Sequence, residues 1–303
     1  MLGHSVSLLL KEKRNIADMP ENEIQDTMAG LSKISGKRPV VALVAPATSR
    51  GTPLTALADL PLLRALLPSL YATMSADYDY RVYLVVNEHD KVFGDKQLVQ
   101  LIFDMARGAW VKRSDGIYSR DVQHELVIVP DSMVPKHALS GLFNHGTLRA
   151  YYDNCDYFYL VNDDLLLISD GWTELFTTAL LSNPILSGLG VAGGVDISDS
   201  VTPQIEFPFF HRTHVRCFDI YMLTMLRVID NSFAQVKIFY WCGANPWTFS
   251  NWWEDNWLTD IYLPFQGVYY EPRVLLSNYV GIDRPTFDLV NEGVLLSICN
   301  IFS

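Results

Sequence analysis

Four short apolar runs in the first half of the chain constrain its fold more than any other feature. Each run is continuous rather than alternating and is rich in Val, Ile, Leu, Tyr or Phe, as are strands buried on both faces of a parallel sheet. The runs are PVVALVA (39–45), RVYLVV (81–86), ELVIV (125–129) and DYFYLV (156–161). The sequence therefore predicts a sheet whose two faces are both covered.

Helical patterns occupy the intervals between these runs and follow the last of them. They span residues 54–75, 96–106, 136–152 and 171–182. Pro61 and Pro68 are expected to break or kink the first pattern. The second carries apolar residues at i, i+3, i+4 and i+7, the spacing of one helix face, namely Leu98, Leu101, Ile102 and Met105. Alternating strands and helices predict an α/β fold, with an open sheet flanked by helices.

Composition excludes several classes of partner. The chain has a formal net charge of −11, whereas nucleic acid and anionic lipid both attract clustered Lys and Arg, so neither is expected to bind. None of the four cysteines forms a C-x-x-C pair, so there is no zinc signature and a reduced compartment is expected. We see no signal peptide and no transmembrane segment in the sequence, so the expected location is cytoplasmic.

The predicted strands end in short polar segments. These are APATSRG (45–51), NEHD (87–90), PDS (130–132) and NDD (162–164). Ligands of open α/β sheets bind outside the carboxyl ends of the strands, so we expect the ligand site here. Neither a G-x-G-x-x-G nor a P-loop pattern follows the first run, which weakens a dinucleotide-binding interpretation.

Asp163 and Asp164 stand at the end of the fourth run, in YFYLVNDDLLLIS. One interpretation is local, because Asp and Asn often cap backbone groups where a strand becomes a turn. The apolar flanks favour another, since two adjacent anions beside a buried strand repel each other and are poorly solvated. A hard divalent cation, Mn²⁺ or Mg²⁺, takes oxygen ligands and bridges to diphosphate. We therefore predict a metal held by Asp164 and Asp163.

A second acidic pair, Glu254 and Asp255, lies among aromatic residues in NWWEDNW. As a structural feature it would be two solvated acids in the first turn of a helix. As a functional feature it would supply a general base in an aromatic cleft, because the apolar faces of sugar rings stack on aromatic side chains such as Trp252 and Trp253. At least two of the five tryptophans between residues 241 and 257 are expected to belong to the core instead.

His211 and His214 bracket HRTH at a spacing that suits either metal ligands or ordinary packing. Several cations are candidate phosphate partners, and the position of Arg50 after the first run makes it the best of them. Other candidates are Lys136, Arg149, Arg212 and Arg284.

With Asn162-Asp163-Asp164 at the fourth strand end and an acidic ED pair about ninety residues later, the chain resembles the nucleotide-sugar-dependent glycosyltransferases of the GT-A fold. The resemblance covers about residues 39–285 and includes RTH…FD (212–219). It implies a mixed, mostly parallel sheet in which a Rossmann-like nucleotide-binding half joins an acceptor-binding half. We expect a polar N-terminal arm (1–37) and a single domain (38–303), divided at residue 170.

The same resemblance implies a role for each matching residue. Asp255, or failing that Glu254, would be the catalytic base of an inverting hexosyl- or pentosyltransferase. Asp164 would bind the metal, with Asp163 or Asn162 on the ribose or the metal's water shell. The acceptor would contact Trp252, Trp253, Arg212 and His214. The donor nucleotide would contact Ala45, Pro46, Thr48, Arg50, Asn87 and Glu88.

The implied partners are a nucleotide-diphosphate sugar and a glycan or other hydroxyl acceptor. No histidine follows His214, so the third metal ligand stays unassigned. Two alternatives remain open at this point. One is a non-catalytic carbohydrate-binding module on the same fold, and the other is a sugar nucleotidyltransferase, which also uses a metal and an acid pair at a sheet edge.

Overall fold

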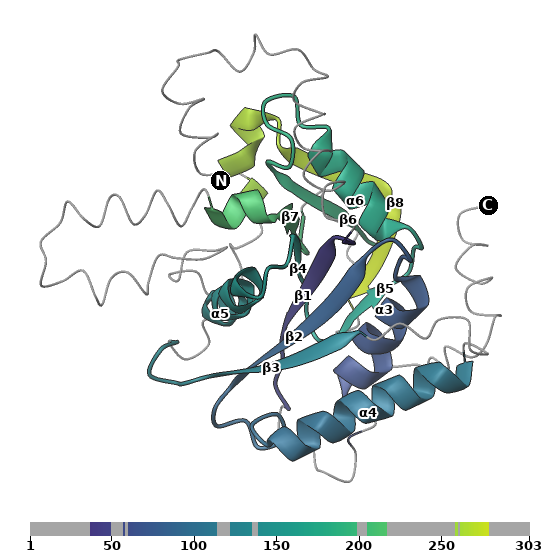
Figure 1. Cartoon of the computed structure of the whole chain (residues 1–303), viewed down its shortest axis with the longest axis vertical. Helices are drawn as coiled ribbons and strands as arrows, with labels where there is room; N and C mark the ends of the chain where they lie inside the picture. The colour runs from purple at the N-terminus through teal and green to yellow at the C-terminus, as the bar shows by residue number, and fades with distance from the viewer. Residues whose placement is uncertain are drawn as a thin grey trace, which may run out of the picture.

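A computed structural model describes residues 37–49, 57, 60–113, 122–134, 139–198, 205–216, 258–259 and 261–278. Its centre is an eight-stranded sheet in the order β3-β2-β1-β4-β7-β6-β8-β5 (Figure 1). The strands are β1 (Val40–Pro46), β2 (Asp79–Asn87), β3 (Gln123–Val129), β4 (Tyr157–Leu160), β5 (Leu165–Leu167), β6 (Val191–Asp196), β7 (Phe209–His211) and β8 (Val268–Asn278).

The sheet is mixed, with a parallel half and a half that contains both parallel and antiparallel neighbours. Strands β3, β2, β1 and β4 are parallel neighbours, and β6 is parallel to β8. Strand β7 is antiparallel to both β4 and β6, and β5 is antiparallel to β8. Each of the four apolar runs forms one of the four parallel strands, as predicted, and the sheet is compatible with the GT-A-like architecture.

Helices cover both faces of the sheet. Helix α5 (Leu139–Tyr152) lies on one face, and α3 (Leu67–Thr73), α4 (Lys96–Arg113) and α6 (Trp172–Leu181) lie on the other (Figure 1). Pro61 is the N-cap of the π-helical turn η3 (Leu62–Leu66), which passes directly into α3 with Pro68 near its start. The chain therefore stays helical past both prolines, and the disruption is a change of helix type rather than a break. A short 3-10 turn, η4 (Leu263–Phe265), precedes β8.

The buried face of α4 differs from the predicted one. The helix forms where expected, but it buries Val99, Ile102, Phe103 and Ala106. Leu101 is 48% exposed and Met105 is 38% exposed. The buried face of α4 is rotated by about one residue from the predicted face. The reason is that Phe103, which has a larger apolar surface than Leu101, packs into the core beside Ile102.

Two apolar layers hold the sheet between its helices. One contains the α3, α4 and α6 side chains together with the alternate strand residues Leu43, Leu84 and Tyr159. The other contains α5 side chains and the strand residues that point to the opposite face of the sheet, such as Val44 and Val85. Strand residues therefore point alternately to two buried faces, which is why the runs are continuously apolar. No described helix is long and apolar enough to cross a membrane.

Gly146 lets α5 approach the sheet closely. A Cβ added there would lie 2.4 Å from Val44 Cγ1 and 2.5 Å from Val85 Cγ2. Because both valines are fully buried, they have little space into which to retreat. We expect Gly146→Ala to lower the free energy of unfolding by about 1–3 kcal/mol, measured by urea denaturation. A loss below about 0.5 kcal/mol would show that the helix shifts freely and that the close contact is unimportant.

Candidate functional site

The carboxyl ends of β1, β2, β3, β4 and β6 meet at one edge of the sheet. The first four strands are parallel, and β6 has the same direction as β4 because β7 is antiparallel to both. The predicted residues Thr48, Asn87, Asn162, Asp163 and Asp164 all follow or end these strands. The fold therefore brings the polar segments chosen from the sequence to a common edge.

Asp163 and Asp164 lie in the turn between β4 and β5, and both are buried, with exposed fractions of 5% and 2%. The Leu165 backbone N–H donates to the Asn162 carbonyl at 3.3 Å and closes the turn. Leu165 and Leu167 then bury their side chains in the core, which draws the turn inward. Two adjacent carboxylates are thus held in a poorly hydrated position, where an oxygen-seeking divalent cation would compensate their charge. This donor set fits Mn²⁺ or Mg²⁺.

Asp90 joins two loops of the same edge and was not singled out from the sequence. Its Oδ2 accepts the Ser49 backbone N–H at 2.7 Å and the Thr48 hydroxyl at 3.3 Å. Its Oδ1 accepts the backbone N–H groups of Val92 and Phe93 at 3.0 and 2.9 Å. One carboxylate therefore fixes the loop after β1 against the loop after β2. Asp90 belongs to the polar strand-end segment NEHD, but its contact with residues about forty positions away leaves no pattern in the local sequence that would predict it.

We expect Asp90→Ala to loosen both loops. Hydrogen bonds to a charged group contribute about 1.5–3 kcal/mol each at best, and cooperative loss of this group should cost about 2–3 kcal/mol in unfolding free energy. Hydrogen exchange should accelerate at the Ser49, Val92 and Phe93 amides. Unchanged protection at Ser49 would mean that the two loops are held together by other contacts.

A second group of potential ligands stands at the ends of β2 and β3. Oxygen or nitrogen atoms of Glu88, His89 and Asp131 lie within 4.8 Å of one another, and all three side chains are exposed. Glu88 Oε1 accepts the Asp131 backbone N–H at 3.1 Å, and Asn87 Nδ2 donates to Asp131 Oδ1 at 3.3 Å. These contacts link the two strand ends. Exposure makes this group a weaker candidate for a cation than the buried pair, because water already solvates its charges.

The other donor residues predicted from the sequence are placed unequally. Ala45 and Pro46 are buried inside β1, so they position the loop that follows them, whereas the exposed Thr48 reaches the edge. Seven of the candidate residues lie outside the described part of the chain: Arg50, Lys136, Trp252, Trp253, Glu254, Asp255 and Arg284. Their roles stay predictions.

The segment after β7 carries the predicted acceptor residues Arg212 and His214. His214 is fully buried, its Nδ1 forms a short hydrogen bond with the Tyr262 hydroxyl, and its ring packs on Phe210. Arg212 lies 5.1 Å over the Tyr151 ring and 3.8 Å from the Asp156 carboxylate. His214 therefore ties residues 209–216 to residues 258–262, which favours a positioning role over direct contact with an acceptor.

His211 gives this segment a pH dependence. Burial, with Arg212 and Arg216 nearby, lowers its pKa from 6.5 to about 4. Its Nδ1 faces the Thr213 hydroxyl at 2.7 Å and the Thr213 backbone N–H at 3.3 Å, so this nitrogen acts as an acceptor in the neutral ring. His211 binds a proton more readily in the unfolded chain than in the folded one. The stability that the neutral ring gives to the folded state is therefore fully present above pH 6.5 and is lost as the pH falls toward 4.

We therefore expect the thermal midpoint of the wild type to fall more steeply between pH 6.5 and 4 than that of His211→Asn, whose amide oxygen accepts the same hydrogen bonds without titrating. Differential scanning fluorimetry at several pH values measures the difference. Parallel pH profiles for the two proteins would contradict this assignment.

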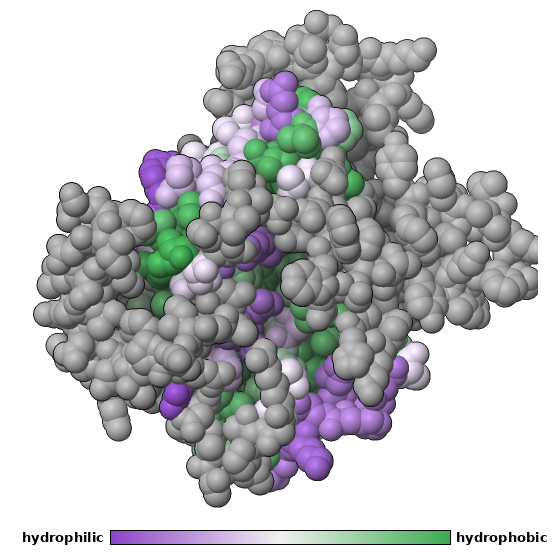
Figure 2. All heavy atoms as spheres, turned by 180° about the vertical axis from the view of Figure 1, so that it is seen from behind, coloured by the Kyte–Doolittle hydropathy of each residue, from purple (hydrophilic) through white to green (hydrophobic). Residues whose placement is uncertain are grey.

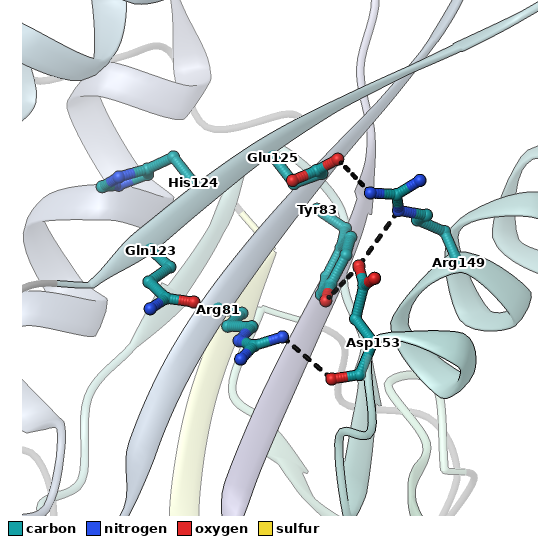
Figure 3. Close-up of a pocket in the computed structure, with 7 residues that line it drawn as sticks. All are labelled: Arg81, Tyr83, Gln123, His124, Glu125, Arg149 and Asp153. Atoms are coloured by element: carbon teal, nitrogen blue, oxygen red, sulfur yellow. Dashed lines mark hydrogen bonds and ion pairs between the residues drawn. The ribbon is translucent and has the colours of Figure 1, made fainter.

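A hollow of about 160 Å³ lies at the opposite edge, where β2 and β3 begin (Figure 3). Arg149 bridges Glu125 at 2.9 Å and Asp153 at 3.0 Å, and Arg81 donates to the Asp153 carbonyl at 3.0 Å. The Tyr83 hydroxyl donates to the same Asp153 carboxylate at 3.1 Å. These contacts fasten the end of α5 to the sheet, so Arg149, a candidate phosphate partner by sequence, is engaged far from the acidic pair.

Comparisons with known proteins give little further information. No family model matches the chain, and no curated protein matches it. Among solved structures, the crystal structure of S. aureus TarS matches with a TM-score of 0.43 and 8% sequence identity. The match covers 80% of this chain and 37% of that one, so the chain spans well under half of that structure. A likeness of this size assigns no function.

Proposed function

We propose that this protein is a metal-dependent glycosyltransferase that moves a sugar from a nucleotide-diphosphate sugar to a hydroxyl acceptor. The observation that carries the proposal is the burial of Asp163 and Asp164 side by side at the carboxyl edge of the parallel strands. That edge is where open α/β sheets bind nucleotides. The resemblance of the strand-end motifs to GT-A glycosyltransferases gives the same answer from the sequence.

The acidic pair would hold the cation and, through it, the donor. Asp164 would be a direct ligand, and Asp163 or Asn162 would contact the ribose or the water shell of the ion. The bound cation would neutralise the negative charge that develops on the departing diphosphate. Without such compensation, a diphosphate would be repelled by two buried carboxylates of the same sign. Metal and donor are therefore expected to bind together.

The remaining roles belong to the flanking loops. Thr48, Asn87 and Glu88 stand at the ends of neighbouring strands and would contact the base and ribose. Asp90 would hold these residues in place, because its carboxylate joins the loop after β1 to the loop after β2. Asp255 would take the proton from the acceptor hydroxyl as that oxygen attacks the anomeric carbon. Trp252 and Trp253 would stack on sugar rings.

Asp255→Asn tests the catalytic role separately from donor binding. The variant keeps the size of the side chain but removes the base, so transfer should fall by about 100-fold or more. The affinity for nucleoside diphosphate with manganese should stay within about twofold. A liquid-chromatography assay of sugar transfer and a calorimetric titration measure the two quantities. Transfer at wild-type rate would remove Asp255 from the mechanism.

The two alternatives predict different outcomes from the wild type. A carbohydrate-binding module would bind glycans but would neither transfer nor hydrolyse any nucleotide sugar. A nucleotidyltransferase would instead release pyrophosphate from a nucleoside triphosphate in the presence of a sugar phosphate. Pyrophosphate release and nucleoside diphosphate release, measured on the same preparation, separate all three functions.

A further inference from the structure

Two loops at the end of the molecule opposite the acidic pair form an uncharged, apolar-tipped surface. One is the segment that joins α6 to β6, and the other is η4 with the turn before β8; both lie at the top of Figure 1. They meet directly, because the Val191 backbone N–H donates to the Gly267 carbonyl at 2.7 Å. We call this surface the apolar end. Its exposed apolar side chains are Ile185, Leu186, Leu263 and Phe265, together with Leu181 at the end of α6 and Tyr270 near the start of β8.

The sequence around the apolar end lacks charge. No charged residue occurs between Glu174 and Asp196 or between Asp260 and Glu271, in a chain whose formal net charge is −11. Leu263 is 63% exposed and Phe265 is 49% exposed, although both are large apolar side chains. Figure 2 shows green, apolar atoms at the surface of this end, beside purple and pale, more hydrophilic ones. Scattered exposed leucines need no explanation, but gathered on two uncharged loops they indicate an apolar partner.

Several backbone groups of both loops are paired within the loops. Asn183 Nδ2 donates to the Leu189 carbonyl at 3.0 Å, and its Oδ1 accepts the backbone N–H groups of Ile185 and Leu186 at 2.8 and 3.0 Å. The Gln266 and Gly267 N–H groups donate to carbonyls within the turn. These pairings lower the cost of placing the apolar tips of the loops in a less polar medium.

We propose that the apolar end seats the protein on a zwitterionic lipid surface. A second copy of the chain fits less well, because two molecules of charge −11 repel each other, whereas a zwitterionic bilayer carries no net charge. The six side chains expose on the order of 500 Å², against about 800 Å² per partner in a standard protein interface. Shallow insertion of a few apolar tips needs no such area.

This seating gives the molecule an orientation. Strands β6 and β8 begin at the apolar end, and β6 runs from it toward the edge that carries Asp163 and Asp164. The acidic edge would face away from the lipid and toward solutes. The inference is independent of the proposed transferase activity, since none of its residues belongs to the proposed site.

Sedimentation with phosphatidylcholine vesicles tests the proposal on the full chain. The wild type should sediment with the vesicles, and a double variant, Leu263→Asp with Phe265→Asp, should lower the bound fraction at least tenfold. Raising the salt concentration should leave wild-type binding unchanged, because no charges are involved. The matched control is Leu101→Asp with Met105→Asp on α4, at the bottom of Figure 1, where the exposed apolar residues are flanked by charges.

Each other outcome overturns the proposal. Wild type that stays in the supernatant, or equal losses in the two double variants, would remove the apolar end as a lipid contact. Light scattering without vesicles measures whether a second copy of the chain occupies the apolar end instead. A wild-type dimer that the Leu263 and Phe265 variant converts to a monomer would assign the surface to a second copy. Thermal midpoints of both variants within a few degrees of the wild type establish that they are folded.

Discussion

Trp172→Ala is expected to cost about 3–5 kcal/mol of unfolding free energy, a large part of the stability of a typical domain. The ring is fully buried and lies 5.1 Å from Tyr159 and 6.2 Å from both Phe176 and Phe209, measured between centroids. Its Nε1–H donates to the Thr73 hydroxyl at 3.2 Å, which links α6 to α3. Truncation leaves a cavity that these aromatic rings cannot fill and takes away the hydrogen bond.

Urea denaturation measures the loss, and Trp172→Phe should recover part of it by restoring ring contacts without the N–H donor. Tyr152→Ala is the matched control, because that ring is an exposed aromatic on α5 and its removal should cost less than about 0.5 kcal/mol. If Trp172→Ala lost less than about 1 kcal/mol, the aromatic cluster could not be the main contact that holds α6 on β4.

Asp164→Asn should lower the affinity for a nucleoside diphosphate in the presence of manganese by about a hundredfold, or roughly 3 kcal/mol. The change keeps the volume of the side chain and removes one of the two buried carboxylates that would hold the cation. A thermal-shift titration with manganese and the nucleotide measures the effect, since a ligand that binds only the folded form raises its midpoint.

His89→Ala is the matched control for this prediction, because it disrupts the exposed group of Glu88, His89 and Asp131 at the same edge. It should leave the manganese-dependent shift intact. If the effects of the two variants were reversed, the cation would belong to that exposed group instead. A purely structural role for Asp164 would lower the midpoint equally with and without manganese.

The strands and their shared edge could be predicted because burial on both faces leaves a continuous apolar run. Val41 and Val44, for example, face opposite layers yet are both fully buried. Parallel strands then place their carboxyl ends together, so the polar residues that follow them, from Thr48 to Asp164, could be assigned to one edge of the sheet before any contact was known.

Contacts between distant segments could not be predicted in this way. Asp90 reaches the loop after β1 across forty residues, and β5 pairs with β8 across more than a hundred. His214 reads as a candidate ligand in sequence, but Tyr262 engages it in the fold. The face of α4 also depended on a tertiary contact, since Phe103 displaced Leu101 from the core. The spacing of apolar residues predicts a helix, but it does not determine which of those residues pack against the sheet.

Anomalous diffraction from crystals grown with manganese and a nucleoside diphosphate would show whether the acidic pair holds the cation. We expect an anomalous peak about 2.0–2.2 Å from a carboxylate oxygen of Asp164, with the diphosphate oxygens completing its shell. A manganese peak beside Glu88, His89 and Asp131, or a diphosphate bound away from the acidic pair, would contradict it.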